Sequence, residues 1–444
     1  MNPFQGTLRR CFITACMLTR TTDLAARGLG AGFFLPSLFV LRYASMGGLE
    51  PSLFASQLRG LRSFKDAAWC GHWDALAQAQ LACAGVPAEA ETWAGLGEAL
   101  RTALRPLGTK VVDWMTQSDA QLETALNADP QVSEESRQAL LTLRCVVKAI
   151  TYLQVSAFPG GTPARMAAYA HSRALFHEMA MVVGPLLGLE ITKHRIDLDG
   201  DAVEGYLVTP SGGGRHPLAI ITNGLEGTVQ ELAIPLLRYH DSGMAVFVME
   251  MPGTYAHRQP MSEASEGAYL AVIEQLSRHP RIDAQRIGFV GVSFGGHWAA
   301  RMAAKSPRLR CAVACGAPTH HSFKVKGTIG IPDVIIRALL NVTGARTLPG
   351  LGLKLQALSL QGLYRQIRIP LLVINGERDT LLSTQDSIDL AEGAPHATLK
   401  LYPDDDHCAM GHYREWLDLS QAWLKEHLSP HQGASHALAS PDLT

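Results

Sequence analysis

After residue 188, short apolar runs alternate with longer stretches of helical periodicity, and this alternation restricts the fold more than any other feature of the chain. Runs that are apolar throughout are typical of strands buried on both faces, and helices between them indicate an α/β fold with a mostly parallel sheet. A hairpin of 194–198 and 203–208, flanking a glycine-bearing turn, is expected to join this sheet. The predicted strands are 218–222, 245–249, 286–292, 310–315, 370–375 and 398–402, and the predicted helices are 229–240, 263–278, 296–305, 384–392 and 412–427.

The first part of the chain has a different pattern, with helical periodicity and no convincing strand. We therefore expect an all-helical, cap-like N-terminal domain at 1–185, including an N-terminal arm, followed by an α/β domain at 186–428 that would carry any catalytic site. Trp69 and Trp73 share one predicted helix face, which suits core packing better than contact with a ligand. The predicted helices here are 64–84, 89–104, 119–126, 133–155 and 163–183.

Two further segments stand apart from the sheet-and-helix pattern. More than 50 residues separate the predicted strands 310–315 and 370–375, which is longer than a crossover needs. We expect 319–366 to be an inserted, lid-like segment over the carboxyl edge of the sheet, where ligands bind in such folds. The tail 429–444 is rich in Pro, Ser, His and Gly, and is expected to be disordered.

The segment Gly291-Val292-Ser293-Phe294-Gly295 follows the pattern Gly-x-Ser-x-Gly, which predicts a nucleophile elbow. The pentapeptide alone is a weak signal, because it arises by chance in about one chain in five. Its context strengthens it, since a predicted strand leads into Ser293 and a predicted helix leads out of it. The sharp turn would raise the hydroxyl clear of the sheet at the positive end of a helix. The alternative is a serine that only caps the helix.

A serine nucleophile needs a base and an acid that orients the base, in the chain order Ser, acid, His for this fold. Asp379 follows the predicted strand 370–375, and His407 follows the next strand, so both are expected on loops at the carboxyl edge. We predict His407 as general base and acid, and Asp379 as its orienting carboxylate. Glu377 is an alternative acid and His412 an alternative base. Residues 404–406 are expected to form mainly a solvated turn.

Stabilisation of an oxyanion requires two N–H donors. We predict the backbone of Phe294, directly after the nucleophile, and that of Leu225, in the loop after strand 218–222, with Glu226 as the second choice for the latter donor. Glu226 is also a candidate substrate contact. The other candidate substrate contacts are Tyr255 and His257, in the loop after strand 245–249, and His297, in the first turn after the elbow.

Composition excludes several other classes of protein. With 39 Lys+Arg against 40 Asp+Glu, the formal charge is −1, and no nucleic-acid partner is expected. The eight cysteines form no Cys-x-x-Cys pair, which indicates reduced thiols in a cytoplasmic protein and neither a disulfide framework nor a metal site. The apolar stretch 28–41 contains Pro36 and is shorter than the ~20 residues of a membrane span, so a buried arm is expected.

These motifs resemble the α/β-hydrolase superfamily. Within it, the chain is similar to the branch whose helical domain precedes the hydrolase core, which includes fermentation-respiration switch esterase-like proteins, a carbon–carbon hydrolase of bacterial nicotine breakdown and fungal hydrolases that shorten polyketide pigment precursors. The pieces that carry the resemblance are Tyr169-x6-Phe176, the segments 223–231, 251–253, 286–296 and 375–379, and Asp406-His407. Met251 replaces the aspartate common before Pro-Gly, and residues 1–50 have no counterpart.

The resemblance implies a Ser–His–Asp hydrolase without a cofactor, acting on a hydrophobic small molecule such as a ketone, ester or thioester. In carbon–carbon cleaving members the substrate is a 1,3-dicarbonyl-type or aryl ketone compound. The same side chains would serve an acyltransferase or cyclase of natural-product assembly, and a serine peptidase or an inactive binding protein remains as a further alternative. A homodimer through the helical domain is also implied.

Overall fold

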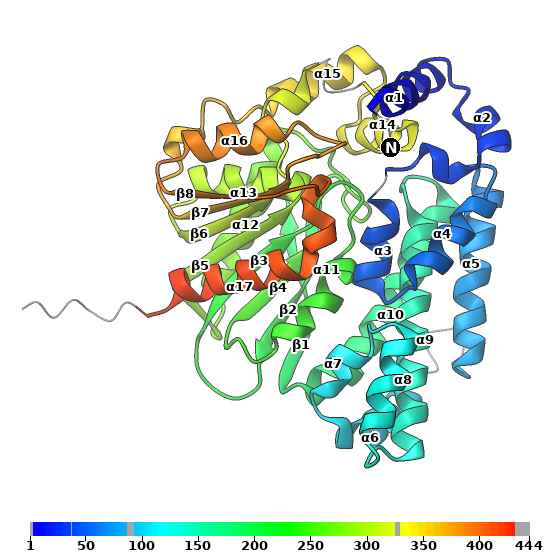
Figure 1. Cartoon of the computed structure of the whole chain (residues 1–444). Coiled ribbons are helices and arrows are strands. Elements are labelled where there is room, and N and C mark those ends of the chain that lie inside the picture. The colour runs from blue at the N-terminus through cyan, green and yellow to red at the C-terminus, as the bar shows by residue number, and fades with distance from the viewer. Residues whose placement is uncertain (1–2, 37, 87–92, 325–328, 431–444) are drawn as a thin grey trace, which may run out of the picture.

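The computed structural model of the chain describes residues 3–36, 38–86, 93–324 and 329–430. Its sheet has eight strands in the order β1-β2-β4-β3-β5-β6-β7-β8 (Figure 1). The strands β3 to β8 run parallel, and the hairpin of β1 and β2 pairs antiparallel with β4. The strands are β1 (Leu189–Leu198), β2 (Asp201–Pro210), β3 (His216–Thr222), β4 (Ala245–Met249), β5 (Ile282–Val292), β6 (Leu309–Cys315), β7 (Leu371–Gly376) and β8 (Ala397–Tyr402). Every predicted strand is present, and the mostly parallel α/β fold is confirmed.

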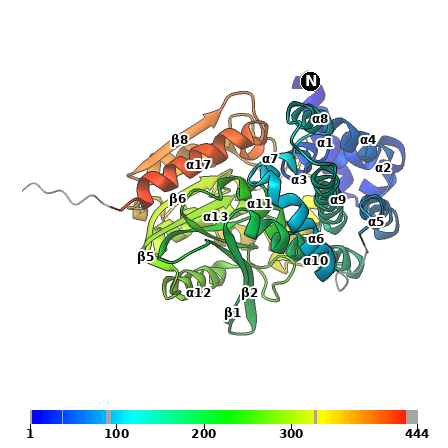
Figure 2. The same cartoon turned by 90° about the horizontal axis from the view of Figure 1, so that it is seen from below.

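Helices cover both faces of this sheet, as its apolar strands require. The helices that follow the strands are α11 (Val229–Leu236), α12 (Glu266–Ser277), α13 (Phe294–Lys305), α16 (Thr384–Gly393) and α17 (Tyr413–Leu428). On one face, Val290 of β5 shares a hydrophobic core with Trp416 of α17. On the other face, the next residue back, Phe289, packs in a second core with Trp298 of α13. Figure 2 shows α17 and α12 on opposite sides of the strands.

Helices make up the chain before the sheet. They are α1 (Pro3–Leu18), α2 (Thr22–Leu29), α3 (Phe39–Gly47), α4 (Pro51–Gly60), α5 (Asp66–Cys83), α6 (Trp93–Leu104), α7 (Lys110–Trp114), α8 (Asp119–Ala128), α9 (Glu134–Ala157) and α10 (Pro163–Leu186). Ser133 caps α9 by accepting from the Ser136 N–H, and Thr162 caps α10 by accepting from the Arg165 N–H, with Pro163 at the first helical position. These starts match the sequence signals.

The helical part and the sheet share one hydrophobic core, which is why the helices need the sheet. Trp69 and Trp73 of α5 are fully buried in the core that also holds Val290 and Trp416, so core packing of these tryptophans is confirmed. Within the described residues, α9 is the helix whose length and hydropathy would suit a membrane crossing. However, 83% of that window is buried inside the protein, as in the core helix of a globular fold.

The segment predicted as an insertion carries two helices, α14 (Asp333–Thr343) and α15 (Leu348–Ala357). Helix α1 packs against α14, so the first and the inserted segments meet although they lie some 300 residues apart in sequence (Figure 1). The Arg10 guanidinium donates to the Ile329 carbonyl at 2.7 Å, and the Thr14 hydroxyl accepts from the Gly330 N–H at 2.8 Å. We call α1, α14 and α15 together the roof. The tail after residue 430 lies outside the described residues.

Candidate active site

Ser293 occupies a strained turn between β5 and α13. Its backbone has φ 58° and ψ −123°, a conformation that residues other than glycine rarely adopt. The turn is tight enough that a Cβ atom at Gly291 would overlap the Gly295 carbonyl, and one at Gly295 would lie 2.5 Å from the Thr222 carbonyl oxygen. Close backbone approach therefore requires glycine two residues before and two residues after the serine, and the sharp turn predicted between a strand and a helix is present.

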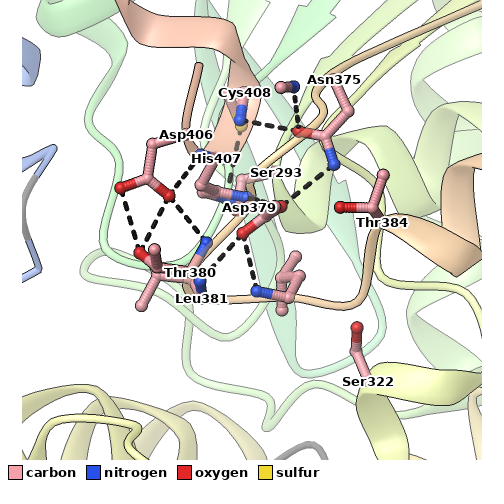
Figure 3. Close-up of polar contacts among 12 residues, drawn as sticks. Ser293, Ser322, Asn375, Asp379, Thr380, Leu381, Thr384, Asp406, His407 and Cys408 are labelled. Atoms are coloured by element: carbon pink, nitrogen blue, oxygen red, sulfur yellow. Dashed lines mark hydrogen bonds and ion pairs between the residues drawn. The ribbon is translucent and has the colours of Figure 1, made fainter. Parts of the chain in front are cut away.

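Three side chains far apart in sequence form one hydrogen-bonded chain at the carboxyl edge of the sheet (Figure 3). The Ser293 Oγ lies 2.8 Å from the His407 Nε2, and the His407 Nδ1 lies 2.8 Å from the Asp379 Oδ2. Asp379 also accepts from the backbone N–H groups of Leu381 and Leu382, and from the Asn375 side chain at 3.0 Å. The carboxylate is thus held in one orientation, and it holds the imidazole in turn.

Asp379 and His407 shift each other's pKa values. Burial lowers the pKa of His407, but the Asp379 carboxylate outweighs burial and places the pKa well above its usual value. Burial raises the pKa of Asp379, and the imidazole together with the Leu382 N–H and Asn375 brings it below the usual value. Asp379 therefore stays ionised, as an acid that stabilises an imidazolium must.

The loop after β3 lies directly against the elbow. A Cβ atom at Gly224 would lie 2.6 Å from the Ser293 Cβ and 2.9 Å from the Phe294 nitrogen. Among the hydrogen bonds of the described residues, none uses the backbone N–H of Leu225 or Phe294. Both residues line the same cavity as Ser293. Two unpaired donors beside the serine hydroxyl are the arrangement that an oxyanion requires.

A cavity of about 760 Å³ extends from Ser293 to the roof. Its walls are mainly aliphatic and aromatic side chains of α1, α3, the end of α9 and the inserted segment, such as Met17, Phe39, Phe158, Phe323, Ile335 and Leu339. The polar and thiol-bearing side chains that line it are Thr14, Arg42, Asn223, Glu231, Ser293, Ser322, Gln356, His407 and Cys408. This volume and lining suit a mostly apolar small molecule.

The chain also matches known proteins in sequence. Residues 108–429 match the family model described as esterase FrsA-like. The chain belongs to this family. FrsA-like relatives include the 2,6-dihydropseudooxynicotine hydrolase of Paenarthrobacter nicotinovorans, 27% identical over 247 residues, which are 52% of this chain and 63% of the relative. Esterase FrsA of Vibrio cholerae serotype O1 is 27% identical over 255 residues, which are 55% of this chain and 60% of that protein. The chain thus covers less than two thirds of the length of these relatives.

Solved structures support the fold independently. The 2,6-dihydroxy-pseudo-oxynicotine hydrolase superposes with a TM-score of 0.64 at 21% identity, over 87% of this chain and 95% of that one. AbyA5 superposes with a TM-score of 0.57 at 24% identity, over 64% of this chain and 83% of that one. The α/β-hydrolase fold with a helical N-terminal region is therefore confirmed.

Several residues expected to touch substrate have partners within the protein instead and do not line the cavity. The buried Glu226 carboxylate accepts from the Gly160 N–H at 2.6 Å. Tyr255 stacks on Tyr169 at 4.5 Å and donates to the Glu226 carbonyl at 3.3 Å. The local sequence does not indicate these partners, because Tyr169 lies in α10, Gly160 lies in the loop before it, and Glu226 is 29 residues from Tyr255 in sequence.

The two histidines proposed as substrate contacts do not line the cavity either. His257 Nδ1 lies 3.4 Å from Asp201 at the start of β2, so this ring serves the hairpin. His297 is fully buried, its Nδ1 lies 3.0 Å from the Pro318 carbonyl, and burial lowers its pKa to about 3. The neutral ring packs against the Phe294 ring, with the two ring centroids 5.3 Å apart.

The alternatives to Asp379 and His407 lie elsewhere. Glu377 is exposed to solvent, and the His412 Nδ1 lies 2.8 Å from the Asp405 carboxylate. The expectation of a solvated turn at 404–406 is wrong for Asp405, which is buried and accepts from the Gly411 and His412 N–H groups. Asp406 accepts from the His407 N–H and from Thr380 (Figure 3). These hydrogen bonds fix the backbone of the loop that carries His407. Among the described residues, no group of His, Cys, Asp and Glu side chains has a metal-binding arrangement.

Sequence reasoning missed three residues that line the same cavity as Ser293. Arg42 of α3 lines the cavity and pairs with Glu231 of α11. Cys408 places its Sγ 3.3 Å from the His407 Nε2. The glutamate lies within the recognised segment 223–231, but no local pattern in residues 1–50 marks Arg42, since only folding brings α3 to this loop.

Proposed function

We propose that this chain is a serine hydrolase in which Ser293, His407 and Asp379 form the catalytic triad. The proposal is carried by one observation, the continuous hydrogen-bonded chain from the Ser293 Oγ through His407 to Asp379 at the inner end of an apolar cavity. The strained backbone at Ser293 keeps the hydroxyl in the cavity, and the ionised Asp379 stabilises the imidazolium that forms during attack.

The reaction follows from these positions. As the Ser293 Oγ attacks the substrate carbonyl carbon, the His407 Nε2 takes the hydroxyl proton, and the Phe294 and Leu225 N–H groups bind the developing oxyanion. When the intermediate collapses, His407 returns that proton to the leaving oxygen, sulfur or carbon. Water then attacks the acyl-serine while His407 accepts a proton from it. As the acid product leaves, His407 returns this proton to the Ser293 Oγ and the hydroxyl is restored.

The cavity supports a hydrophobic ketone, ester or thioester as substrate. Its length from Ser293 to the roof suits an acyl or polyketide-like chain, and the aromatic side chains along it suit an aryl group. Cleavage of a carbon–carbon bond in a β-dicarbonyl compound is part of the proposal. The leaving carbanion of such a compound is stabilised by its second carbonyl group, so the same triad and oxyanion donors would serve.

Labelling tests the nucleophile without knowledge of the natural substrate. A fluorophosphonate probe should label the wild-type chain once, at Ser293, and should not label Ser293→Ala. The matched control is Ser322→Ala, because Ser322 lines the same cavity but has no contact with His407; this variant should label like wild type. Labelling that persists in Ser293→Ala would overturn the proposal.

Product analysis then tests the reaction. p-Nitrophenyl esters of increasing chain length should be hydrolysed, with kcat/KM rising as the acyl chain fills the cavity, and Ser293→Ala should lose about 10⁴-fold of kcat. A 1,3-diketone should yield one carboxylic acid and one methyl ketone, the two products expected from carbon–carbon cleavage. If an added alcohol receives the acyl group in preference to water, the chain is an acyltransferase and the hydrolytic assignment fails.

A further inference from the structure

Four large apolar side chains at the mouth of the cavity are exposed to solvent. They line the cavity and are also open to water, with exposed fractions of 60% for Leu18, 48% for Ile329, 39% for Leu348 and 71% for Leu353. We call these four residues the rim. The rim comes from α1 and from the inserted segment, which meet at one end of the molecule, away from the β1–β2 hairpin (Figure 1). Apolar surface that continues into an apolar cavity indicates a contact site.

Helix α1 extends this surface, because it is apolar on two faces. Ile13, Cys16 and Met17 are buried against neighbouring segments. On the outer face, residues 8, 11, 15 and 18 are spaced by three and four and form an exposed stripe of Leu, Cys, Ala and Leu. A helix that only covered the core would carry polar side chains there.

Positive charge accompanies the exposed apolar surface. Residues 3–22 and 329–366, which contain the roof, hold seven basic side chains and one acidic side chain, whereas the whole chain has a formal charge of −1. The acidic residue, Asp333, is paired with Arg337. Arg20, Arg346 and Arg365 are exposed and make no ion pair in the described part of the chain. A face that is both basic and apolar is complementary to anionic lipid headgroups over an acyl layer.

We propose that the roof docks on the surface of an anionic lipid bilayer, with the rim in the interface, so that an apolar substrate passes from the lipid into the cavity. A second copy of this chain is a poorer occupant, since it would close the cavity mouth and bring like charges together. The docking itself is independent of the catalytic assignment, and only the delivery of substrate rests on the proposed function.

Vesicle sedimentation tests the docking. The full chain should sediment with vesicles of phosphatidylcholine mixed with phosphatidylglycerol, and much less with phosphatidylcholine alone. Leu8→Glu, on the exposed stripe but outside the cavity lining, should reduce the bound fraction about tenfold, because it removes apolar contact and adds repulsion. The matched control is Leu53→Glu on α4, since the two leucines are 54% and 53% exposed. The control should bind like wild type.

A second variant tests the contribution of positive charge to vesicle binding. Arg346→Gln should weaken binding to the anionic vesicles, and added salt should weaken it further, since exposed charges are screened. Circular dichroism and hydrolysis of a soluble short-chain ester should be unchanged in Leu8→Glu and Arg346→Gln, so a loss of binding would not reflect unfolding or a damaged site.

Three results would overturn the proposal. Equal binding of Leu8→Glu and Leu53→Glu would show that the stripe is not the contact. If the wild-type chain does not bind anionic vesicles, an anionic bilayer is not the partner of the roof. A wild-type dimer in analytical ultracentrifugation that Leu8→Glu dissociates would show that a second copy covers the roof. Each of these results is distinct from a failure of Ser293 to label, which would overturn the proposed function instead.

Discussion

Arg42 of α3 and Glu231 of α11 form a two-point ion pair, with the Arg42 Nε 2.5 Å from one carboxylate oxygen and the Nη2 2.8 Å from the other. The same Nη2 donates to the Glu226 carbonyl at 3.1 Å, and Glu231 also accepts from the Asn223 side chain. The pair therefore ties the helical part of the protein to both ends of the loop that carries Gly224 and Leu225. Burial lowers the pKa of Arg42, but the Glu231 carboxylate outweighs this and keeps the guanidinium charged.

Replacing Arg42 should impair catalysis through this loop. Arg42→Met removes both loop contacts and leaves a buried carboxylate unpaired, which should lower the free energy of unfolding by about 3 kcal/mol. Misplacement of the Leu225 N–H should lower kcat by about 10- to 100-fold with a smaller change in KM. The double variant Arg42→Met/Glu231→Leu should recover most of the stability but not kcat. Recovery of both would assign Arg42 a structural role alone.

Gly224 should tolerate no side chain. In Gly224→Ala the new methyl group would press on the Ser293 Cβ and the Phe294 nitrogen, so either the elbow or the loop must move. We expect kcat to fall about 100-fold while the thermal midpoint changes little, since the loop can shift into the cavity. Gly213 is the control, because a Cβ there would meet no atom within 4 Å. A Gly224→Ala enzyme with wild-type kcat would contradict the close approach.

Activity should rise with pH through the titration of His407. The imidazole must be neutral to accept the serine proton, and the Asp379 carboxylate favours the charged form. The inflection of kcat/KM should therefore lie above the usual histidine pKa of 6.5. Glu250 is a second buried group that titrates near neutral pH, so Glu250→Gln serves as the control and should leave this inflection in place. A profile already flat from about pH 6 upwards would contradict the raised pKa.

Glu250 should make the protein less stable as the pH rises. Burial raises its pKa to about 7 from 4.5, although the nearby Arg173 and the Tyr169 hydroxyl, at 2.8 Å, act against the rise. Between these values the folded chain holds a proton that the unfolded chain has lost, so the free energy of unfolding falls with pH, by up to about 3 kcal/mol in all. Glu250→Gln should remove this decline. Urea unfolding of both proteins at about pH 5 and about pH 8 would measure it, and parallel declines would contradict the assignment.

Much of the fold could be predicted because local patterns encode it. The apolar runs around 218–222 and 370–375 are buried on both faces in any sheet that they could join, and the caps at Ser133 and Thr162 act within one helical turn. The order of Ser293, Asp379 and His407 was also accessible, since each follows a predicted strand and parallel strands end at one edge. These features depend on neighbours in sequence or on a single topological rule.

Contacts between distant segments were beyond the sequence. Nothing within residues 1–50 marks Arg42 as a partner of Glu231. Likewise, the sequence around Tyr255 does not indicate that this ring stacks on Tyr169, and the sequence around His257 does not indicate its contact with Asp201. The apolar composition of α1 and α15 was readable, but which leucines stay exposed depends on how these helices dock on α14. The sequence determined the strands, the helices and the serine elbow through local periodicity, whereas the tertiary structure decided which side chains meet, because packing energy depends on three-dimensional neighbours.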